Sequence, residues 1–376
     1  MRRLTFRHVV LTLILTFGVI TIWSIGSYVV AAEDGSVSQR IATWARNHHM
    51  GAIVDKLEEV RYSKPPSTKP ADELGLNETV INADPTTATT IPETLTVVPV
   101  DISPVVTPAL PNEGHWQPIV TANHQTVAWA TSLRPLPSAA SVVATYVVID
   151  QASLVAGLFN GTELPGGGPW TNGSHVGNSA LPSLILAFNG GFRFEHQDGG
   201  YYTEGKVVQP LVKGQASLAI DQNGHVTIGE YGRDLTNDGT WRSIRQNLPL
   251  IIDHGNSVLS KNPYVNWGED YHDKIYVLRS AVCQHKSGSL TYAVVGDVNI
   301  KMLTQAMLLA NCEKAMELDI NGDWPQLATY TNPNTTKRTG IQIDKRMKNL
   351  NRYINRSSKD FVAFFDPVLL PSGIVK

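Results

Sequence analysis

The chain has 376 residues, with 31 Lys and Arg against 33 Asp and Glu, so its formal net charge at pH 7 is −2. This balance and the lack of a basic run argue against a nucleic-acid-binding surface. The cysteines and histidines lack the spacing of a zinc site, and no nucleophile elbow, phosphate-binding loop or dinucleotide motif is present.

An apolar segment near the N-terminus, Val9–Val30, has 22 residues without a charged side chain, which is enough to cross a bilayer as a helix. Arginines precede it, and Glu33 and Asp34 follow it, so the N-terminus is predicted to be cytoplasmic. Val30-Ala31-Ala32 would suit signal-peptide cleavage, but the length favours an uncleaved signal-anchor. We therefore expect residues 1–32 to form a cytoplasmic tip and transmembrane anchor, with the main domain outside the cell membrane.

The next two segments predict a helix and a tether. Apolar residues recur at helical spacing between Ser38 and Arg61, with Gly51 in the middle, so residues 33–63 are expected to form two short helices or one kinked helix beside the membrane. Residues 64–114 contain nine of the 22 prolines and no periodicity. This composition predicts a disordered Pro/Thr-rich linker.

Residues 115–376 read as one large domain dominated by strands. The clearest helix is Met302–Asn311, and no internal repeat is apparent. Many strands with few helices predict an α+β fold built on a large mixed or antiparallel sheet. The expected strands are Gln125–Leu133, Ser141–Ile149, Ser153–Phe159, Ser183–Phe188, Ser217–Ile220, His225–Gly229, Leu248–Ile252, Lys274–Gln284, Leu290–Val295, Ala315–Ile320 and Phe361–Phe365.

Two of these strands run into turns rich in Gly and Asn. One leads into Asn189, Gly190 and Gly191, and the other is Ala315–Ile320 with Asn321–Asp323 after it. Alternation along the second strand predicts that Glu317 and Asp319 share one face, with Cα atoms about 6.6 Å apart. Two carboxyl groups at this distance perturb each other's pKa and can serve as acid and base. Ordinary solvent-exposed charges at a strand end are the alternative.

The order of these motifs resembles the phosphodiester glycosidase (NAGPA-like) family between about Trp116 and Tyr330. Phe188-Asn189-Gly190-Gly191-Phe192 resembles the family's NGGF signature. Further similarities lie in Gly214–Asp221, Arg245–Gly255, Leu278–Val282 and Ala315–Asp319. The sequence departs from the family after Asp319, where Ile320-Asn321-Gly322-Asp323 replaces a run of glycines, and Glu317 replaces an Asn.

The resemblance implies a glycosidase that cleaves a sugar-1-phosphate diester, with Asp319 as the first catalytic candidate. Glu317 is the second candidate, or the residue that orients Asp319. Asn189, Gly190 and Gly191, together with Asn321 and Asp323, are expected to bind substrate. Plain turn chemistry is the alternative for all five of these residues.

Two further residues are catalytic candidates. Arg279 interrupts an apolar strand and needs a partner there, such as Asp319, Glu317 or a substrate phosphate. His254 follows another strand, at what we expect to be the same sheet edge, and could act as acid or base. A structural salt bridge and a surface histidine are the respective alternatives.

No cofactor is required by these motifs. Asp319, Asn321 and Asp323 alternate in a way that could hold a divalent cation through oxygen atoms, although turn formation explains them equally well. Cys283 and Cys312 would lie in an oxidising compartment, and we expect a disulfide between them, with two unpaired buried thiols as the alternative.

The leading hypothesis is a membrane-anchored extracytoplasmic hydrolase that cleaves a sugar-1-phosphate diester or related glycosidic bond in envelope or extracellular glycans by carboxylate acid/base chemistry. The rival hypothesis is a non-catalytic glycan-binding or envelope-scaffolding protein on a degenerate version of the fold. In that case Trp170, Trp267 and Trp324 would be expected to form sugar-stacking surfaces.

Overall fold

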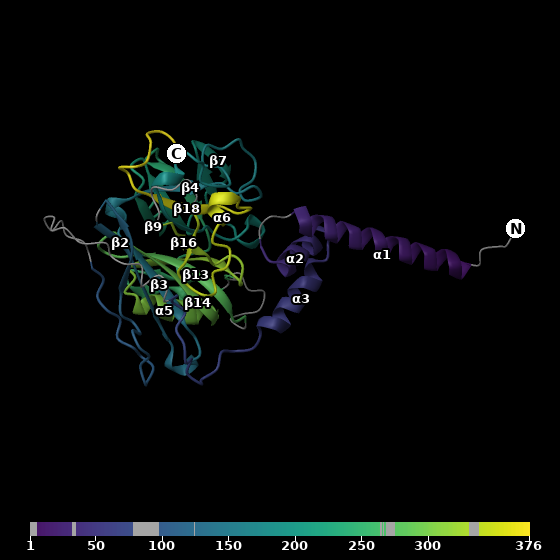
Figure 1. Cartoon of the computed structure of the whole chain (residues 1–376), viewed down its shortest axis with the longest axis horizontal. Helices are drawn as coiled ribbons and strands as arrows, with labels where there is room; N and C mark the ends of the chain where they lie inside the picture. Colours follow the sequence, from purple (N-terminus) through teal and green to yellow (C-terminus); the bar gives the residue numbers. More distant parts are fainter. Residues whose placement is uncertain are drawn as a thin grey trace. The chain divides into compact units, whose positions relative to one another are not determined.

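The computed structural model describes residues 6–31, 35–77, 98–123, 125–263, 265, 267, 275–330 and 338–376 (Figure 1). The chain divides into two compact units, Met1–Val60 and Arg61–Lys376.

The first unit is helical. α1 (Phe6–Ala31) contains a 24-residue stretch, His8–Ala31, with a mean hydropathy of 2.2, which is long and apolar enough to cross a membrane. A signal sequence near the N-terminus has the same properties. α2 (Val37–Asn47) packs on α1 through Trp44, whose indole Nε1 donates a hydrogen bond to Ser24 Oγ at 3.0 Å.

α3 (Gly51–Tyr62) is tied to α2 by ion pairs from Arg46 to Asp55 and Glu58, at 3.0 and 2.8 Å. The periodic segment 38–61 is therefore two helices. Gly51 begins the second of them.

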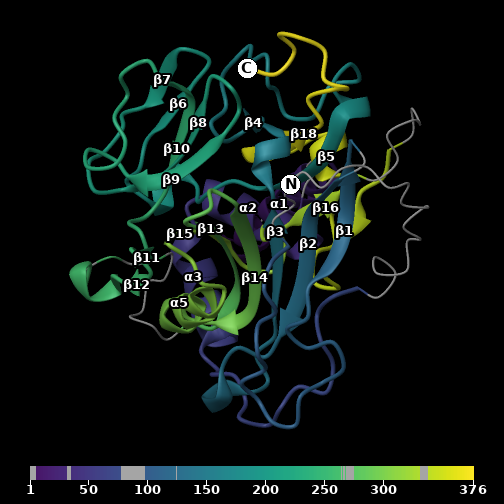
Figure 2. The ribbon, with the colours of Figure 1, turned by 90° about the vertical axis from the view of Figure 1, so that its left-hand side faces the viewer.

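The second unit has the expected α+β composition. Its described strands form three sheets in which the paired neighbours are antiparallel (Figure 2). The largest is eight-stranded, in the order β1-β2-β3-β14-β13-β15-β11-β12. Its strands are β1 (Gln117–Ala122), β2 (Gln125–Leu133), β3 (Ala144–Ile149), β11 (Ile252–Asp253), β12 (Asn256–Ser257), β13 (Val277–Gln284), β14 (Leu290–Val298) and β15 (Lys314–Ile320).

Two five-stranded sheets complete the described part of this unit. One, in the order β7-β6-β10-β8-β9, contains β6 (Tyr201–Thr203), β7 (Lys206–Gln209), β8 (Ala216–Asp221), β9 (Val226–Glu230) and β10 (Trp241–Gln246). The other, in the order β17-β16-β5-β18-β4, contains β4 (Val155–Phe159), β5 (Leu184–Asn189), β16 (Leu327–Thr329), β17 (Ile341–Gln342) and β18 (Phe361–Phe365).

The eight-stranded sheet has an apolar cluster on each face. α5 (Ile300–Leu309) packs on one face through Leu303, Ala306 and Met307, together with Ala281 of β13. Asn299 caps this helix, because its side-chain oxygen accepts a hydrogen bond from the Met302 amide at 3.0 Å. The opposite face packs against residues of the two smaller sheets, such as Phe188 and Leu218. The end of β15 therefore lies where the three sheets meet.

The two flanks of the predicted linker 64–114 are packed on the domain. Leu76 forms an isolated bridge with Asp344, and Val106 is buried. Glu113 forms a buried ion pair with Arg134 at 2.6 Å, and the same guanidinium donates a hydrogen bond to the Pro108 carbonyl at 2.6 Å. These two flanks of the predicted linker are therefore ordered segments that pack on the surface of the domain. The middle of the predicted linker, 78–97, lies outside the described residues.

Candidate active site

A β-bulge near the end of β15 separates the two predicted catalytic carboxylates. In the pairing of β13 with β15, Ala281 lies opposite Glu317 and Arg279 lies opposite Ile320. Two steps along β13 thus match three steps along β15, which is the signature of a bulge. Met316 and Leu318 pack in the cluster that faces the smaller sheets. Ile320 returns to the α5 side, where Ala315 packs.

The expectation that Glu317 and Asp319 share a face is therefore wrong. Glu317 Oε1 pairs with Arg279 Nη1 at 2.5 Å, and both side chains have no exposed surface. Arg279 also donates to the carbonyls of Val298 at 2.8 Å and Trp267 at 3.0 Å. These partners lie on the α5 side of the sheet. Arg279 and Glu317 thus form a structural ion pair inside the sheet.

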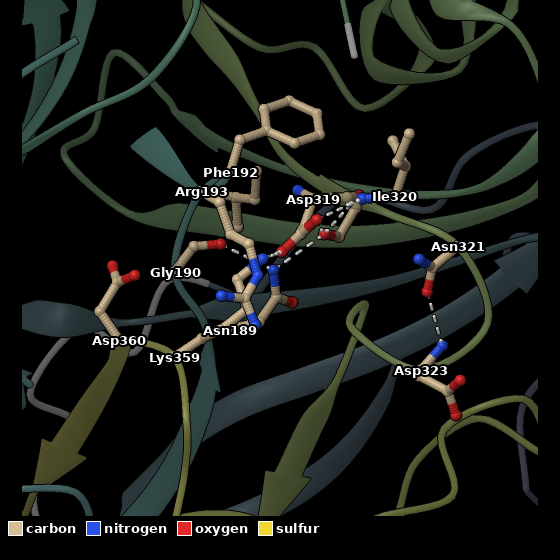
Figure 3. A network of polar contacts seen from close by, with 12 residues as sticks. Asn189, Gly190, Phe192, Arg193, Asp319, Ile320, Asn321, Asp323, Lys359 and Asp360 are labelled. Atoms are coloured by element: carbon tan, nitrogen blue, oxygen red, sulfur yellow. Dashed lines mark hydrogen bonds and ion pairs between the residues drawn. The ribbon is translucent and has the colours of Figure 1, made fainter. Parts of the chain in front are cut away.

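Asp319 instead pairs with Lys359, which precedes β18 in the chain. Figure 3 shows the two side chains gathered with Asn189 and Arg193. The exposed fraction is 5% for the Asp319 side chain and 7% for that of Lys359. Burial raises the pKa of the Asp319 carboxyl above its usual range, against the opposing effect of Lys359. Burial also lowers the pKa of the Lys359 ammonium, against the effect of Asp319. The pair is thus shifted toward its neutral forms.

Asn189, the last residue of β5, holds the backbone around Asp319 in place. Its side-chain oxygen accepts from the Tyr292 hydroxyl at 2.8 Å and the Gln326 amide at 3.0 Å. Its side-chain nitrogen donates to Ser280 Oγ at 3.1 Å, and this hydroxyl bridges the amide and carbonyl of Asp319, each at 3.2 Å. The Asn189 amide therefore acts through Ser280, and its contacts are those of a positioning residue.

Gly190 and Gly191 allow a second buried ion pair to approach the loop. A side chain on Gly190 would overlap the carboxylate of Asp360, and one on Gly191 would lie 3.1 Å from the guanidinium carbon of Arg245. Arg245 Nε pairs with Asp360 at 2.8 Å. The glycines are required for this close packing, and neither has a positive φ.

Asn247 connects the Gly-Gly loop to the bulge. Its side-chain oxygen accepts from the Phe192 amide at 3.2 Å, and its side-chain nitrogen donates to the carbonyls of Glu317 and Leu318 at 2.6 and 2.9 Å. One amide side chain therefore fixes both the NGGF loop and the strand that carries Asp319.

Three cations surround the Trp324 ring in the turn after β15. Lys359 Nζ lies 4.6 Å from the ring centroid, and the guanidinium carbons of Arg352 and Arg193 lie at 4.9 and 6.0 Å. Arg193 is partly exposed and pairs with Glu163 at 2.8 Å, whereas Arg352, in α6 (Arg352–Asn355), is buried. Cations over an aromatic face are attracted by its quadrupole. This Trp324 cluster concentrates positive charge beside Asp319.

Asn321 and Asp323 do not converge with Asp319, as Figure 3 shows. Asn321 Oδ1 accepts a hydrogen bond from the Asp323 amide at 3.1 Å, and Asn321 has a φ of 72°. This is the local turn chemistry expected of an Asn-Gly-Asp sequence. Within the described ranges, no group of three or more His, Cys, Asp or Glu side chains could hold a metal ion.

His254 lies at the other end of β15 from Asp319. It pairs with Glu313, just before the start of β15, at 3.1 Å, and its side chain is 71% exposed. The expectation that it shares the sheet edge of Asp319 is therefore wrong. β11 pairs with β15 at Ala315, so its C-terminal turn reaches the beginning of the antiparallel partner strand.

The expected disulfide between Cys283 and Cys312 is present. It joins the end of β13 to the connection between α5 and β15 on the α5 side of the sheet. The three candidate sugar-stacking tryptophans do not form one platform. Trp267 and Trp324 are buried, and Trp170 carries Lys206 Nζ over its ring at 5.1 Å.

Lys359, Asp360, Arg245 and Asn247 were not predicted as site residues. Lys359 and Asp360 stand directly before Phe361–Phe365, a strand with every residue buried. A charged pair that leads into a wholly apolar strand is a signal that could have identified them. Arg245 and Asn247 lie next to Gln246 in a polar stretch that carries no such signal.

Residues 183–319 match the family model for phosphodiester glycosidases, NAGPA. These residues therefore carry a phosphodiester glycosidase domain match of the NAGPA family. The match begins just before β5 and ends at Asp319, so it contains the NGGF loop, Arg245, Arg279 and the bulged strand. Lys359 and Asp360 lie beyond the matched residues in sequence. The fold brings them into contact with Asp319 and Arg245, which lie within the match.

Solved structures with similarity to the phosphodiester glycosidase domain include the catalytic domain of zebrafish N-acetylglucosamine-1-phosphodiester alpha-N-acetylglucosaminidase. That structure is 15% identical with a TM-score of 0.44, over 67% of this chain and 87% of the zebrafish chain. A hypothetical protein from Synechocystis is 9% identical with a TM-score of 0.42, over 65% of this chain and 63% of its own. A comparison with curated proteins found no match.

Proposed function

We propose that this protein hydrolyses the bond between a sugar and a phosphodiester in envelope or extracellular glycans, with Asp319 as the catalytic carboxylate. The observation that carries this proposal is the buried Asp319–Lys359 pair within a phosphodiester glycosidase domain. Both groups are shifted toward their neutral forms, which is typical of groups that exchange protons during catalysis. The second carboxylate, Glu317, is held by Arg279 and plays no direct part.

The phosphate of the substrate binds at the Trp324 cluster. Arg193, which is partly exposed, provides a guanidinium that can contact two phosphate oxygens. Lys359 lies beside it and near Asp319. An incoming phosphate attracts the Lys359 ammonium away from the carboxylate, because both are anionic acceptors. Substrate binding thereby frees the Asp319 carboxylate at the moment when the anomeric carbon is nearby.

In the hydrolytic step, water adds to the anomeric carbon and the bond from that carbon to the phosphate oxygen breaks. Asp319 accepts a proton from the water, and the electron pair of the broken bond stays on the phosphate. The products are the free sugar and a phosphate monoester. Lys359 and Arg193 stabilise the additional negative charge on the leaving phosphate. Asn189 keeps Asp319 in position through Ser280.

The N-terminal helix supports a location outside the cytoplasm. α1 contains an apolar stretch of 24 residues, and the described cysteines are joined in a disulfide, which persists in oxidising compartments. We propose that α1 is an uncleaved anchor with its N-terminus in the cytoplasm. The domain is then held near glycans of the cell surface.

The decisive experiment uses a sugar 1-(4-nitrophenyl phosphate) diester and the variant Asp319→Asn. Cleavage at the anomeric carbon releases 4-nitrophenyl phosphate, so colour develops only when a phosphatase is added afterwards. Cleavage on the other side of phosphorus releases 4-nitrophenol directly. We expect colour that depends on phosphatase, and a fall of about 10³-fold in kcat/KM for Asp319→Asn, because general acid–base groups contribute about 10²–10⁴-fold.

Asp323→Asn is the matched control, since it removes a carboxylate from the same turn region, and Asp323 does not converge with Asp319 (Figure 3). It should retain most activity. Full activity in a folded Asp319→Asn variant would refute the catalytic assignment. Glycan binding without any product from the wild-type protein would favour the rival binding function, which the low exposure of Asp319 also fits.

A further inference from the structure

A cavity lies beside the turn that follows Asp319. It has a volume of about 620 Å³, which is the size of a small-molecule or sugar site. Gly322 forms part of its wall, and the adjacent Asn321 donates its amide hydrogen to the Leu278 carbonyl at 2.8 Å. The turn that follows Asp319 therefore contributes to this cavity.

An ion pair between Arg346 and the buried Asp344 fixes one wall of the cavity. Arg346 donates to Asp344 through Nε at 2.8 Å and Nη2 at 2.6 Å, and its Nη1 donates to the Val143 carbonyl at 2.8 Å. Asp344 is fully buried and also accepts the Thr145 hydroxyl at 2.6 Å. A side-chain carbon on Gly296 would lie 2.6 Å from Arg346 Nη1, so β14 needs a residue without a side chain at this position. The wall is therefore rigid before any ligand binds.

Two exposed charges of opposite sign line the same cavity. Asp297, near the end of β14, has a φ of 50°, a backbone conformation that is costly for a residue other than glycine. Lys348 contributes an ammonium from the segment after Arg346. Across the part of the chain that the structure describes, neither charge has a hydrogen bond or ion pair. Two further exposed charges, Lys345 and Glu73, line the cavity and pair with each other at 3.2 Å.

The arrangement of these charges restricts the ligand. Lys348 suits an acidic group, because Lys345 is already paired with Glu73, whereas the Asp297 carboxylate accepts hydrogen bonds from hydroxyl groups. A simple polyanion would be repelled by Asp297, and an apolar ligand would leave both charges without partners. A sugar unit with one acidic substituent satisfies both sides of the cavity.

We propose that this cavity binds an acidic sugar unit, one that neighbours the cleaved unit in the glycan. Binding of the acidic sugar does not depend on the proposed function, whereas its position next to the cleaved unit does. The subsite would let the domain select an acidic glycan chain while the Asp319 site performs the cleavage.

Binding of D-glucuronic acid and D-glucose, measured by saturation-transfer NMR on the full chain, tests the proposal. The two sugars differ only in a carboxylate against a hydroxymethyl group. We expect glucuronic acid to bind more tightly than glucose, and Lys348→Met to weaken its binding about fivefold, as loss of one exposed charge contact predicts. Lys286→Met is the matched control, because this exposed lysine lies in the hairpin at the other end of β13 and β14.

Equal binding of the two sugars, no binding by the wild-type chain, or unchanged glucuronic acid binding in Lys348→Met would overturn the proposal. Lys348 is exposed, so its variant is expected to fold, and circular dichroism checks this. Asp319→Asn should keep full glucuronic acid binding. A protein that binds glucuronic acid but cleaves no diester would refute the proposed function while leaving this subsite intact.

Discussion

Glu317 and Asp319 stand two residues apart on β15, and each forms a buried ion pair with a very different environment. The partner of Glu317 is Arg279 on the adjacent strand, whose guanidinium also donates to two main-chain carbonyls. The partner of Asp319 is Lys359, 40 residues further along the chain and outside the eight-stranded sheet. Only the second pair retains some exposure.

The difference shows how one strand can hold both a structural ion pair and a candidate catalytic residue. An ion pair that is completely buried inside a sheet cannot exchange partners without breaking the sheet. A pair between a strand end and a separate loop can exchange its contact for a ligand at lower cost. The bulge between Leu318 and Ile320 makes the separation possible, because it turns Asp319 away from the face of Glu317.

The largest expected effect on stability comes from Glu317→Gln. This change leaves the Arg279 charge buried beside a neutral amide, so we expect the free energy of unfolding to fall by about 3–5 kcal/mol. Chemical denaturation would measure it. Asp319→Asn should cost clearly less, because Lys359 has a lowered pKa and can lose its proton. If Asp319→Asn proved the more destabilising of the two, the assignment of scaffold and catalytic pairs would be reversed.

The disulfide between Cys283 and Cys312 should contribute slightly less to the free energy of unfolding than the Arg279–Glu317 pair. Cys283 and Cys312 are 29 residues apart, and a closed loop of this size corresponds to roughly 3–4 kcal/mol in the chain-entropy model. We expect Cys283→Ser and Cys312→Ser to destabilise equally, and the double variant to be no worse than either one. Additive losses in thermal unfolding would contradict a shared bond. Catalysis by the folded variants should be unchanged.

The smallest expected effect is a shift in the pH dependence of activity, which substitutions of Lys359 should cause. The Lys359 ammonium lowers the pKa of Asp319, against the stronger effect of burial. Activity that needs the ionised carboxylate rises with pH through this pKa. Lys359→Met removes the opposing charge, so the acidic limb of the kcat/KM profile should move to higher pH by about one unit or more.

Lys359→Arg keeps the charge and should leave that limb near its wild-type position. An acidic limb at the same pH in wild type, Lys359→Met and Lys359→Arg would show that Lys359 does not influence the Asp319 carboxyl. A general loss of activity without movement of the limb would leave Lys359 only its proposed contact with the leaving phosphate.

Some of the strands made of apolar runs were predicted with their exact bounds. Gln125–Leu133 coincides with β2, and Phe361–Phe365 coincides with β18. Of the expected strand Leu248–Ile252, only Ile252 is in a strand. β10 was missed because its inward residues include Arg245 and Gln246, whose burial depends on Asp360 and on main-chain groups far away in sequence. No local pattern encodes such partners.

The sequence by itself determined the apolar N-terminal helix, the α+β class, the resemblance to phosphodiester glycosidases and the expected pairing of its two cysteines. Each of these depends on local periodicity, on motif order or on a choice between few partners. Only the tertiary structure decided that Glu317 and Asp319 face apart, that Lys359 meets Asp319, and that His254 lies at the far end of β15. A single extra residue in a strand reverses which way its side chains point, and a buried charge takes its partner from whichever segment the fold brings beside it.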